Sequence, residues 1–215
     1  MTRPDRHRFV TLKRSWRDGA DISACGMARA DRLLDWVDAG RPLVVASSAP
    51  GDEVKTVRLG LSTPQKQRFG LRVQTNAIDD ILPAVRLNDA AVSAPPSWKP
   101  TIDAILEVVE QHELDLSVFG SLAWSHLSGE DHLRPTSDLD ILVSTPVQVD
   151  ARVVIQALLA IESMPRLDGE LVLTSGAGVN LREYARQPEH ILTKQHGGPQ
   201  LVPLATLESV AGRAP

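Results

Sequence analysis

Two aspartates separated by one residue, Asp138 and Asp140, stand at the start of an apolar run of the sequence. Side chains two positions apart on a β-strand point to the same face, so these two carboxylates would lie side by side. Like charges at that spacing repel each other and favour a cation bound between them. Mg²⁺ prefers such hard oxygen ligands and shares them with substrate phosphates. We therefore predict that Asp138 and Asp140 are catalytic carboxylates that bind Mg²⁺ or Mn²⁺.

Sixteen residues separate a glycine–serine pair, Gly120-Ser121, from Asp138. Glycine allows a tight turn and the close approach of a phosphate. Ser121 offers a hydroxyl, and as the cap of a short helix it would stand beside exposed N–H groups, which bind anions. We predict that Gly120 and Ser121 bind the polyphosphate tail of a donor. Each motif alone is a common turn or a solvated acidic pair, but their order of strand, turn, helix and strand favours the functional interpretation.

Further candidates for the same site lie downstream. Asp168 and Glu170 share one face of a predicted strand at 166–173, and either would complete the metal-binding carboxylates. The alternative for both is a turn, because Asp-Gly is a favoured turn dipeptide. Lys194 and His196 lie just before Gly197-Gly198-Pro199 and are candidate phosphate contacts. The alternative is that they are a solvated loop lysine and a surface histidine.

These motifs need elements to position them, and the hydrophobic pattern predicts an α+β fold. The proline-rich segment 93–100 predicts a junction between a small strand-rich α+β domain at 1–95 and a catalytic domain at 96–215. The second domain would hold a mixed sheet with flanking helices. Periodicity predicts helices at 27–37, 101–112, 149–162, 181–186 and 204–211, and strands at 42–46, 54–61, 67–74, 114–119, 138–143, 166–173 and 191–194.

Composition excludes several classes of protein. The net charge of −4 argues against a general nucleic-acid binder. No apolar run is long enough for a membrane span, and the N-terminus lacks the apolar core of a secretory signal. The single cysteine, Cys25, fits a reducing compartment, so we expect a cytoplasmic protein. Residues 1–17 are locally basic, which indicates either a solvated terminus or a contact for an acidic partner or a polyphosphate.

The two motif segments, VFGSLAW at 118–124 and PTSDLDIL at 135–142, resemble the polymerase-β-like nucleotidyltransferase superfamily. More narrowly, the chain resembles the phosphoribosyl-dephospho-CoA transferases that make the holo acyl carrier protein of malonate decarboxylase. The narrower resemblance rests on the sixteen-residue spacing and on further segments along the chain: Arg6-His7, RPLVV at 41–45, VRLGL at 57–61, RLDGEL at 166–171 and LREY at 181–184. One departure is Ala46-Ser47-Ser48, where the family pattern predicts a basic cluster.

This resemblance implies a triphosphoribosyl-dephospho-CoA donor, a serine of the apo acyl carrier subunit of malonate decarboxylase as acceptor, and pyrophosphate as product. It matches Asp138 and Asp140 to the family's catalytic aspartates. The domain before the junction would help to bind the donor or the acidic carrier. Two alternatives stay open: another transferase of this fold, such as one using a nucleoside triphosphate or the citrate lyase prosthetic-group transferase, and a non-catalytic binding module with a degenerate site.

Overall fold

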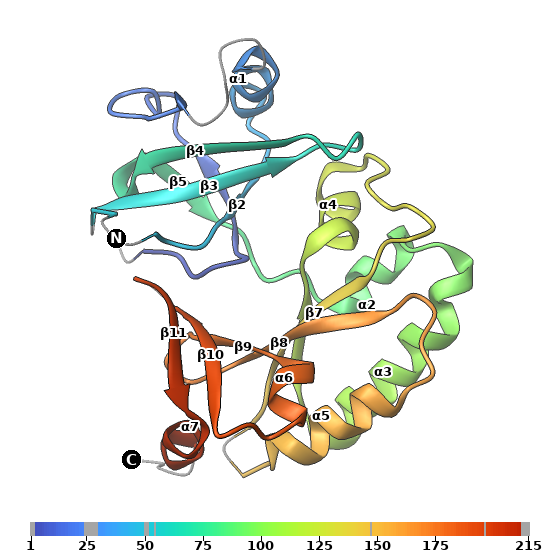
Figure 1. Ribbon diagram of the computed structural model, residues 1–215. Helices are drawn as coiled ribbons and strands as arrows, with labels where there is room; N and C mark the ends of the chain where they lie inside the picture. The colour runs from blue at the N-terminus through green and yellow to red at the C-terminus, as the bar shows by residue number, and fades with distance from the viewer. Residues whose placement is uncertain are drawn as a thin grey trace. The chain divides into compact units, whose positions relative to one another are not determined.

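The computed structural model describes residues 3–23, 30–49, 52–53, 55–146, 148–195 and 197–211, so Cys25 and His196 lie outside the described residues. The chain divides into two compact units (Figure 1). The first comprises the chain up to Ala84 with the short segments 130–132 and 196–198, and the second comprises the rest. Each unit has its own β-sheet and helices, which confirms the predicted α+β class. None of the described helices is both long and apolar enough to cross a membrane.

The first unit is built on a five-stranded antiparallel sheet. Its strands are β1 (Phe9–Leu12), β2 (Leu43–Val45), β3 (Thr56–Ser62), β4 (Arg68–Gln74) and β5 (Ile78–Ile81), in the order β4-β3-β2-β1-β5. Alternate residues of β3 and β4, such as Leu59 and Leu71, are buried on one face. Helix α1 (Ala30–Asp38) contributes Leu33, Trp36 and Val37 to the buried residues of this unit. The other face of β3 and β4 is only partly covered.

The second unit is built on a six-stranded mixed sheet. Its strands are β6 (Asp115–Val118), β7 (Leu139–Ser144), β8 (Leu167–Val172), β9 (Gly178–Asn180), β10 (His190–Gln195) and β11 (Gly198–Pro203), in the order β11-β10-β9-β8-β7-β6. β7 and β8 run parallel, whereas β6–β7, β8–β9 and β9–β10 are antiparallel pairs. The parallel pair requires a crossover, which the helix after β7 supplies.

Six of the described α-helices belong to the second unit: α2 (Leu87–Ala90), α3 (Lys99–His112), α4 (Gly120–Ser128), α5 (Ala151–Ala160), α6 (Leu181–Ala185) and α7 (Leu204–Ala211). Proline is tolerated in the first turn of α3 because the N–H it lacks would have no partner there. The side chains of Asp150 and Asn180 cap α5 and α6 by accepting backbone N–H groups. α3 packs against α5, and α5 against α6 (Figure 1).

The division between the units lies about ten residues before the proline-rich segment. Val85 already belongs to the second unit, where its carbonyl accepts the N–H of Val118. The prolines form short turns inside this unit: residues Pro96–Trp98 make one turn of 3₁₀-helix, and Trp98 is buried. The units therefore divide at Ala84–Val85, whereas the sequence placed the junction at residue 95. The prolines interrupt the regular secondary structure, but the chain on both sides of them packs in the second unit.

Candidate functional site

The mixed sheet of the second unit has one apolar face and one polar face. On β7, Leu139, Ile141 and Val143 are fully buried, while Asp140 between them is only partly buried. Strand alternation puts Asp140 on the opposite face from these apolar side chains. The same alternation and the strand register bring six further polar residues to that face: Asp138, Arg166, Asp168, Glu170, Asn180 and Lys194. All seven of the polar residues come from four separate segments of the sequence.

Asp140 lies directly over Gly120, at the start of α4. A Cβ atom added to Gly120 would lie 1.9 Å from Oδ2 of Asp140, closer than any side chain can come. Gly120 also has a φ of +64°, a left-handed conformation that glycine adopts without strain. The backbones are tied at the same point, because the N–H of Phe119 donates to the carbonyl of Asp140 at 3.0 Å. The structure thus brings the glycine–serine pair and the second aspartate together.

Ser121 does not cap α4. The helix begins at Gly120, and the capping position is held by Phe119, whose side chain makes no capping hydrogen bond. Ser121 is therefore the second residue of the helix, within the first turn whose N–H groups lack partners inside the helix. The predicted cap is wrong because the left-handed glycine, and not the serine, makes the turn. The predicted position of Ser121 at the helix start is confirmed.

Asp168 stands opposite Asp140 in the parallel pair of β7 and β8. Neighbouring strands lie about 4.8 Å apart, so the two carboxylates start from adjacent positions on the polar face. Oδ1 of Asp168 accepts two hydrogen bonds, one from the backbone N–H of Gly169 at 2.9 Å and one from the side-chain amide of Asn180 at 3.2 Å. Oδ2 takes no hydrogen bond from any described residue. Asn180 thereby orients Asp168 and leaves one oxygen for a ligand.

The Asp168-Gly169 dipeptide is not a turn, because both residues lie inside β8. Gly169 has a packing reason instead: a Cβ atom there would lie 2.2 Å from the carbonyl oxygen of Ile141 on β7. Only glycine lets the two strands approach this closely. The turn interpretation is therefore wrong.

Asp138, just before β7, is bound by Arg166. The guanidinium contacts the carboxylate with two nitrogens, Nε to Oδ1 at 3.0 Å and Nη2 to Oδ2 at 2.5 Å. The backbones also meet here, since the N–H of Leu139 donates to the carbonyl of Arg166. The Arg166 side chain is 62 % exposed, so solvent and a ligand can reach this ion pair. Arg166 thus holds Asp138 at the edge of the polar face.

Glu170 is buried and bound by Lys194. Its side chain is only 5 % exposed, and Nζ of Lys194 donates to Oε1 at 2.8 Å. Glu170 lies two residues after Asp168 on β8. It stands opposite Leu142 of β7 and Asn180 of β9. Lys194 lies within β10 and not in a loop, so the solvated-loop alternative is wrong. The lysine neutralises a buried carboxylate beside the aspartates.

Replacing Lys194 with methionine should therefore destabilise the second unit. Removing one partner of a fully buried ion pair costs about 3–5 kcal/mol. Lys194 is 37 % exposed, so we expect a smaller loss, about 1–2 kcal/mol, in the free energy of unfolding measured with urea. A Lys194→Met/Glu170→Met double variant should recover most of that loss, because it leaves no unpaired charge. Equal stability of the single variant and the parent protein would show that the pair is not coupled.

Two neighbouring carboxylates suit a divalent cation. No group of three or more histidine, cysteine, aspartate or glutamate side chains suited to a metal occurs within the described ranges. Mg²⁺ does not need such a cage, because one or two protein carboxylates together with substrate phosphates usually hold it. Asp140 and Asp168 meet that requirement by their register. Glu170 does not, since its carboxylate is buried against a lysine.

Sequence reasoning named most of this site but not its ion pairs. Arg166 and Asn180 were missed as site residues, although Arg166 stands two positions before Asp168, directly before β8. Alternation along the predicted strand 166–173 puts Arg166, Asp168 and Glu170 on one face, so the sequence indicated that Arg166 lies beside the two carboxylates. Asn180 had none, because the three-residue strand that ends with it has no hydrophobic pattern.

Comparison with known proteins gives a consistent result for both units. A family model described as the phosphoribosyl-dephospho-CoA transferase MdcG C-terminal domain matches residues 86–205, and the corresponding N-terminal domain model matches residues 5–84. These matches meet where the structure divides the chain. No solved structure matches the chain significantly.

Curated relatives cover nearly the whole chain. A phosphoribosyl-dephospho-CoA transferase of Xanthomonas euvesicatoria pv. vesicatoria is 35 % identical over 218 residues, which covers 97 % of this chain and 99 % of that protein. The transferase of Xanthomonas campestris pv. campestris (strain 8004) is 33 % identical over 207 residues, covering 94 % and 95 %. The transferase of Bradyrhizobium diazoefficiens is 35 % identical over 198 residues, covering 89 % and 86 %.

Proposed function

Because this chain belongs to the phosphoribosyl-dephospho-CoA transferase family, we propose that it loads the acyl carrier subunit of malonate decarboxylase. The donor is 2′-(5″-triphosphoribosyl)-3′-dephospho-CoA, and the acceptor is a serine hydroxyl of the apo carrier. The observation that supports the site is the position of Asp140, over Gly120 and opposite Asp168. That arrangement joins a phosphate-binding turn to a pair of carboxylates.

In the proposed reaction the seryl oxygen forms a bond to the α-phosphorus of the triphosphate, and the bond to the departing pyrophosphate breaks. The triphosphate lies against the turn at Gly120-Ser121, where glycine permits a close approach and the first turn of α4 presents N–H groups. Asp138 and Asp140 are the catalytic carboxylates. Lys194, whose ammonium already lies at the polar face, is a further phosphate contact.

Asp140 and Asp168 are the residues that we propose to hold Mg²⁺ or Mn²⁺. When bound, such an ion offsets the charge that develops on the attacking and leaving oxygens of an in-line displacement. Asn180 fixes the orientation of Asp168, and Arg166 fixes that of Asp138. In this arrangement Asp168 is the third carboxylate of the site, because Glu170 is already neutralised by Lys194.

Mass spectrometry of the apo carrier protein tests this function. Incubation with this enzyme, the triphosphoribosyl donor and Mg²⁺ should add the mass of one phosphoribosyl-dephospho-CoA group to a serine of the carrier. Exhaustive chelation should stop the addition, and excess Mg²⁺ or Mn²⁺ should restore it, because the site needs a hard cation. ATP in place of the donor should give no product. Turnover with ATP, or full transfer after chelation, would contradict the proposal.

A further inference from the structure

Two arginines stand opposite each other on the partly covered face of the first unit's sheet. Arg58 on β3 is paired in register with Arg72 on β4. Directly opposed side chains on antiparallel strands lie about 5 Å apart at Cβ, and like charges there repel each other. The two arginines at these positions therefore require a negative charge nearby that offsets their repulsion.

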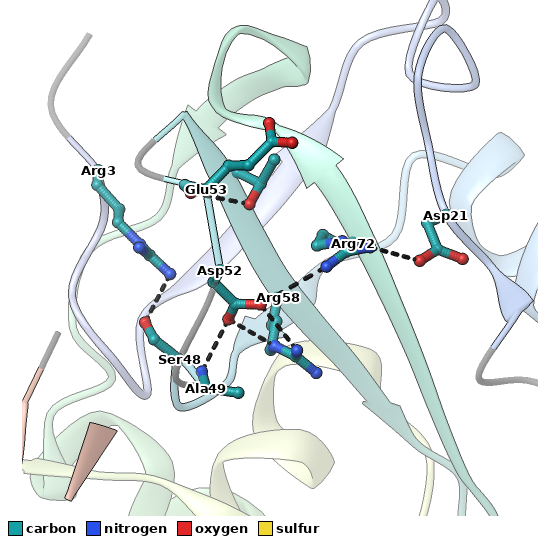
Figure 2. A network of polar contacts seen from close by, with 9 residues as sticks. Arg3, Asp21, Ser48, Ala49, Asp52, Glu53, Arg58 and Arg72 are labelled. Carbon is teal, nitrogen blue, oxygen red and sulfur yellow. Dashed lines mark hydrogen bonds and ion pairs between the residues drawn. The ribbon is translucent and has the colours of Figure 1, made fainter. Parts of the chain in front are cut away.

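The counter-charge is Asp52, which lies beside Arg58 and Arg72 (Figure 2). Its side chain is almost completely buried. Nε and Nη2 of Arg58 donate to its two oxygens at 2.6 and 2.7 Å, and the N–H of Ala49 donates to Oδ2 at 2.8 Å. Arg72 lies 3.6 Å from Oδ1 and also pairs with Asp21 at 2.8 Å. The hydrogen bonds from Arg58 hold the pKa of Asp52 well below its ordinary value, so the carboxylate stays charged at neutral pH.

The negative charge is buried whereas the positive charges are accessible. The Asp52 side chain is 4 % exposed, but those of Arg58 and Arg72 are 42 % and 40 % exposed. Asp52 takes two of the five N–H donors of Arg58 and fixes the guanidinium in one orientation. Fixed, partly exposed guanidinium groups match phosphate, which they bind through paired hydrogen bonds.

A third arginine reaches the same loop from the N-terminus. Nη2 of Arg3 donates to Oγ of Ser48, next to Ala49, at 2.6 Å (Figure 2). Arg3 therefore brings a positive charge to the loop after β2 from a distant part of the sequence. The solvated-terminus interpretation is wrong for Arg3 and Arg8, since Arg8 also donates to the carbonyl of Leu82 at 2.6 Å.

Two glycines extend the arginine face. Gly60 and Gly70 are the next registered pair on the same face of β3 and β4. A Cβ atom at Gly70 would meet nothing within 4 Å, and one at Gly60 would meet only ordinary contacts, the nearest being Val44 at 3.6 Å. Neither glycine has a positive φ, so the backbone does not require it. Glycine inside a strand is destabilising and often marks the close approach of a ligand.

We propose that this face of the first unit binds the dephospho-CoA part of the donor. Arg58 and Arg72 would bind its diphosphate, and an adjoining group of the donor would lie along the bare backbone at Gly60 and Gly70. Asp52 is a positioning residue that orients Arg58. The identity of the ligand rests on the proposed function, whereas the anion site rests on the first unit alone.

Isothermal titration of the full-length protein with dephospho-CoA tests the inference. An Arg58→Gln/Arg72→Gln double variant should bind dephospho-CoA at least about tenfold more weakly, the loss typical of one charge-assisted hydrogen bond. Binding of pantetheine, which has no phosphate, should not change. Arg17→Gln is the matched control, because Arg17 is a half-exposed arginine of the same unit, bound to Asp38 at 2.6 Å. This control should bind like the parent protein.

A Gly70→Val variant tests the same face without removing a charge. Its side chain has room and its backbone is already extended, so the variant should fold and keep both arginines in place. It should weaken dephospho-CoA binding because it covers the bare backbone. Parent-like dephospho-CoA binding by the glycine variant and by the folded double-arginine variant would overturn the proposal. A loss of affinity only for the apo carrier would overturn it too, in favour of a carrier-docking surface.

The Asp140→Asn protein separates this inference from the proposed function. It should lose transfer but bind dephospho-CoA as the parent protein does. If the parent protein transfers nothing to the carrier while its dephospho-CoA binding still depends on the two arginines, the proposed function fails and the anion site stands. If transfer proceeds and the double-arginine variant has the parent KM for the donor, the anion site fails alone.

Discussion

Replacing Asp140 with asparagine should lower the rate of carrier modification by more than about 100-fold, beyond the loss typical of outer-shell partners of a metal. Asp140 lies over Gly120 and opposite Asp168, so it is the carboxylate nearest to both halves of the site. Asparagine has almost the same size and should occupy the same place. Its amide carries no negative charge with which to hold a cation. Single-turnover mass spectrometry of the carrier measures the rate, and circular dichroism reports the fold.

Asp115→Asn is the matched control for this substitution. Asp115 begins β6 in the same sheet, its side chain is 69 % exposed, and among the described residues it forms only a long ion pair, 3.8 Å, with Arg86. Exposed pairs of this kind contribute little, so transfer should stay within about twofold of the parent rate. Transfer by the Asp140→Asn protein within tenfold of the parent rate, with an intact fold, would exclude Asp140 from the reaction.

Replacing Gly120 with alanine should lower transfer by about 100-fold, even though no charge is removed. The new Cβ atom would lie 1.9 Å from Oδ2 of Asp140, so the carboxylate or the turn must move by an ångström or more. A displacement of about 1 Å in a reacting site costs about 100-fold in rate. The φ of +64° adds backbone strain of about 1–2 kcal/mol, which urea unfolding should detect.

Gly129→Ala separates the strain from the clash. Gly129 ends the same helix, α4, with a φ of +70°, but a Cβ atom there would meet nothing within 4 Å. This variant should lose a similar amount of stability, about 1–2 kcal/mol, and keep its transfer rate. Equal transfer by the two alanine variants would mean that the contact between Gly120 and Asp140 has no role in catalysis.

Local pattern predicted the elements that carry the chemistry. The apolar period at 101–112 and the alternation at 138–143 correspond to α3 and β7, with boundaries shifted by a few residues. These elements follow from sequence because each buries one face of side chains, and that requirement appears directly as a period of 3.6 or 2. The proximity of Gly120 to Asp138–Asp140 was likewise expected from the order of strand, turn and helix.

Four of the described strands were not predicted from the sequence: β1, β5, β9 and β11. Strands that are equally short, such as β2 and β6, were predicted, so length alone does not explain the difference. β9 forms because β8 and β10 offer hydrogen bonds on both of its sides. The proline-rich segment at 93–100 is a strong local signal for a boundary, but the units divide elsewhere, between Ala84 and Val85.

The sequence by itself determined that several carboxylates would share one sheet face, because alternation is a local rule. It did not decide between Asp168 and Glu170, which obey that rule equally well. The parallel register of β7 and β8 distinguishes their positions, because it places Asp168 opposite Asp140 and Glu170 opposite Leu142. Lys194 from β10 then neutralises Glu170, and Arg166 binds Asp138. Register and ion pairing join residues distant in the sequence, so only the tertiary structure determines which carboxylates lie side by side and which are bound by a cationic side chain.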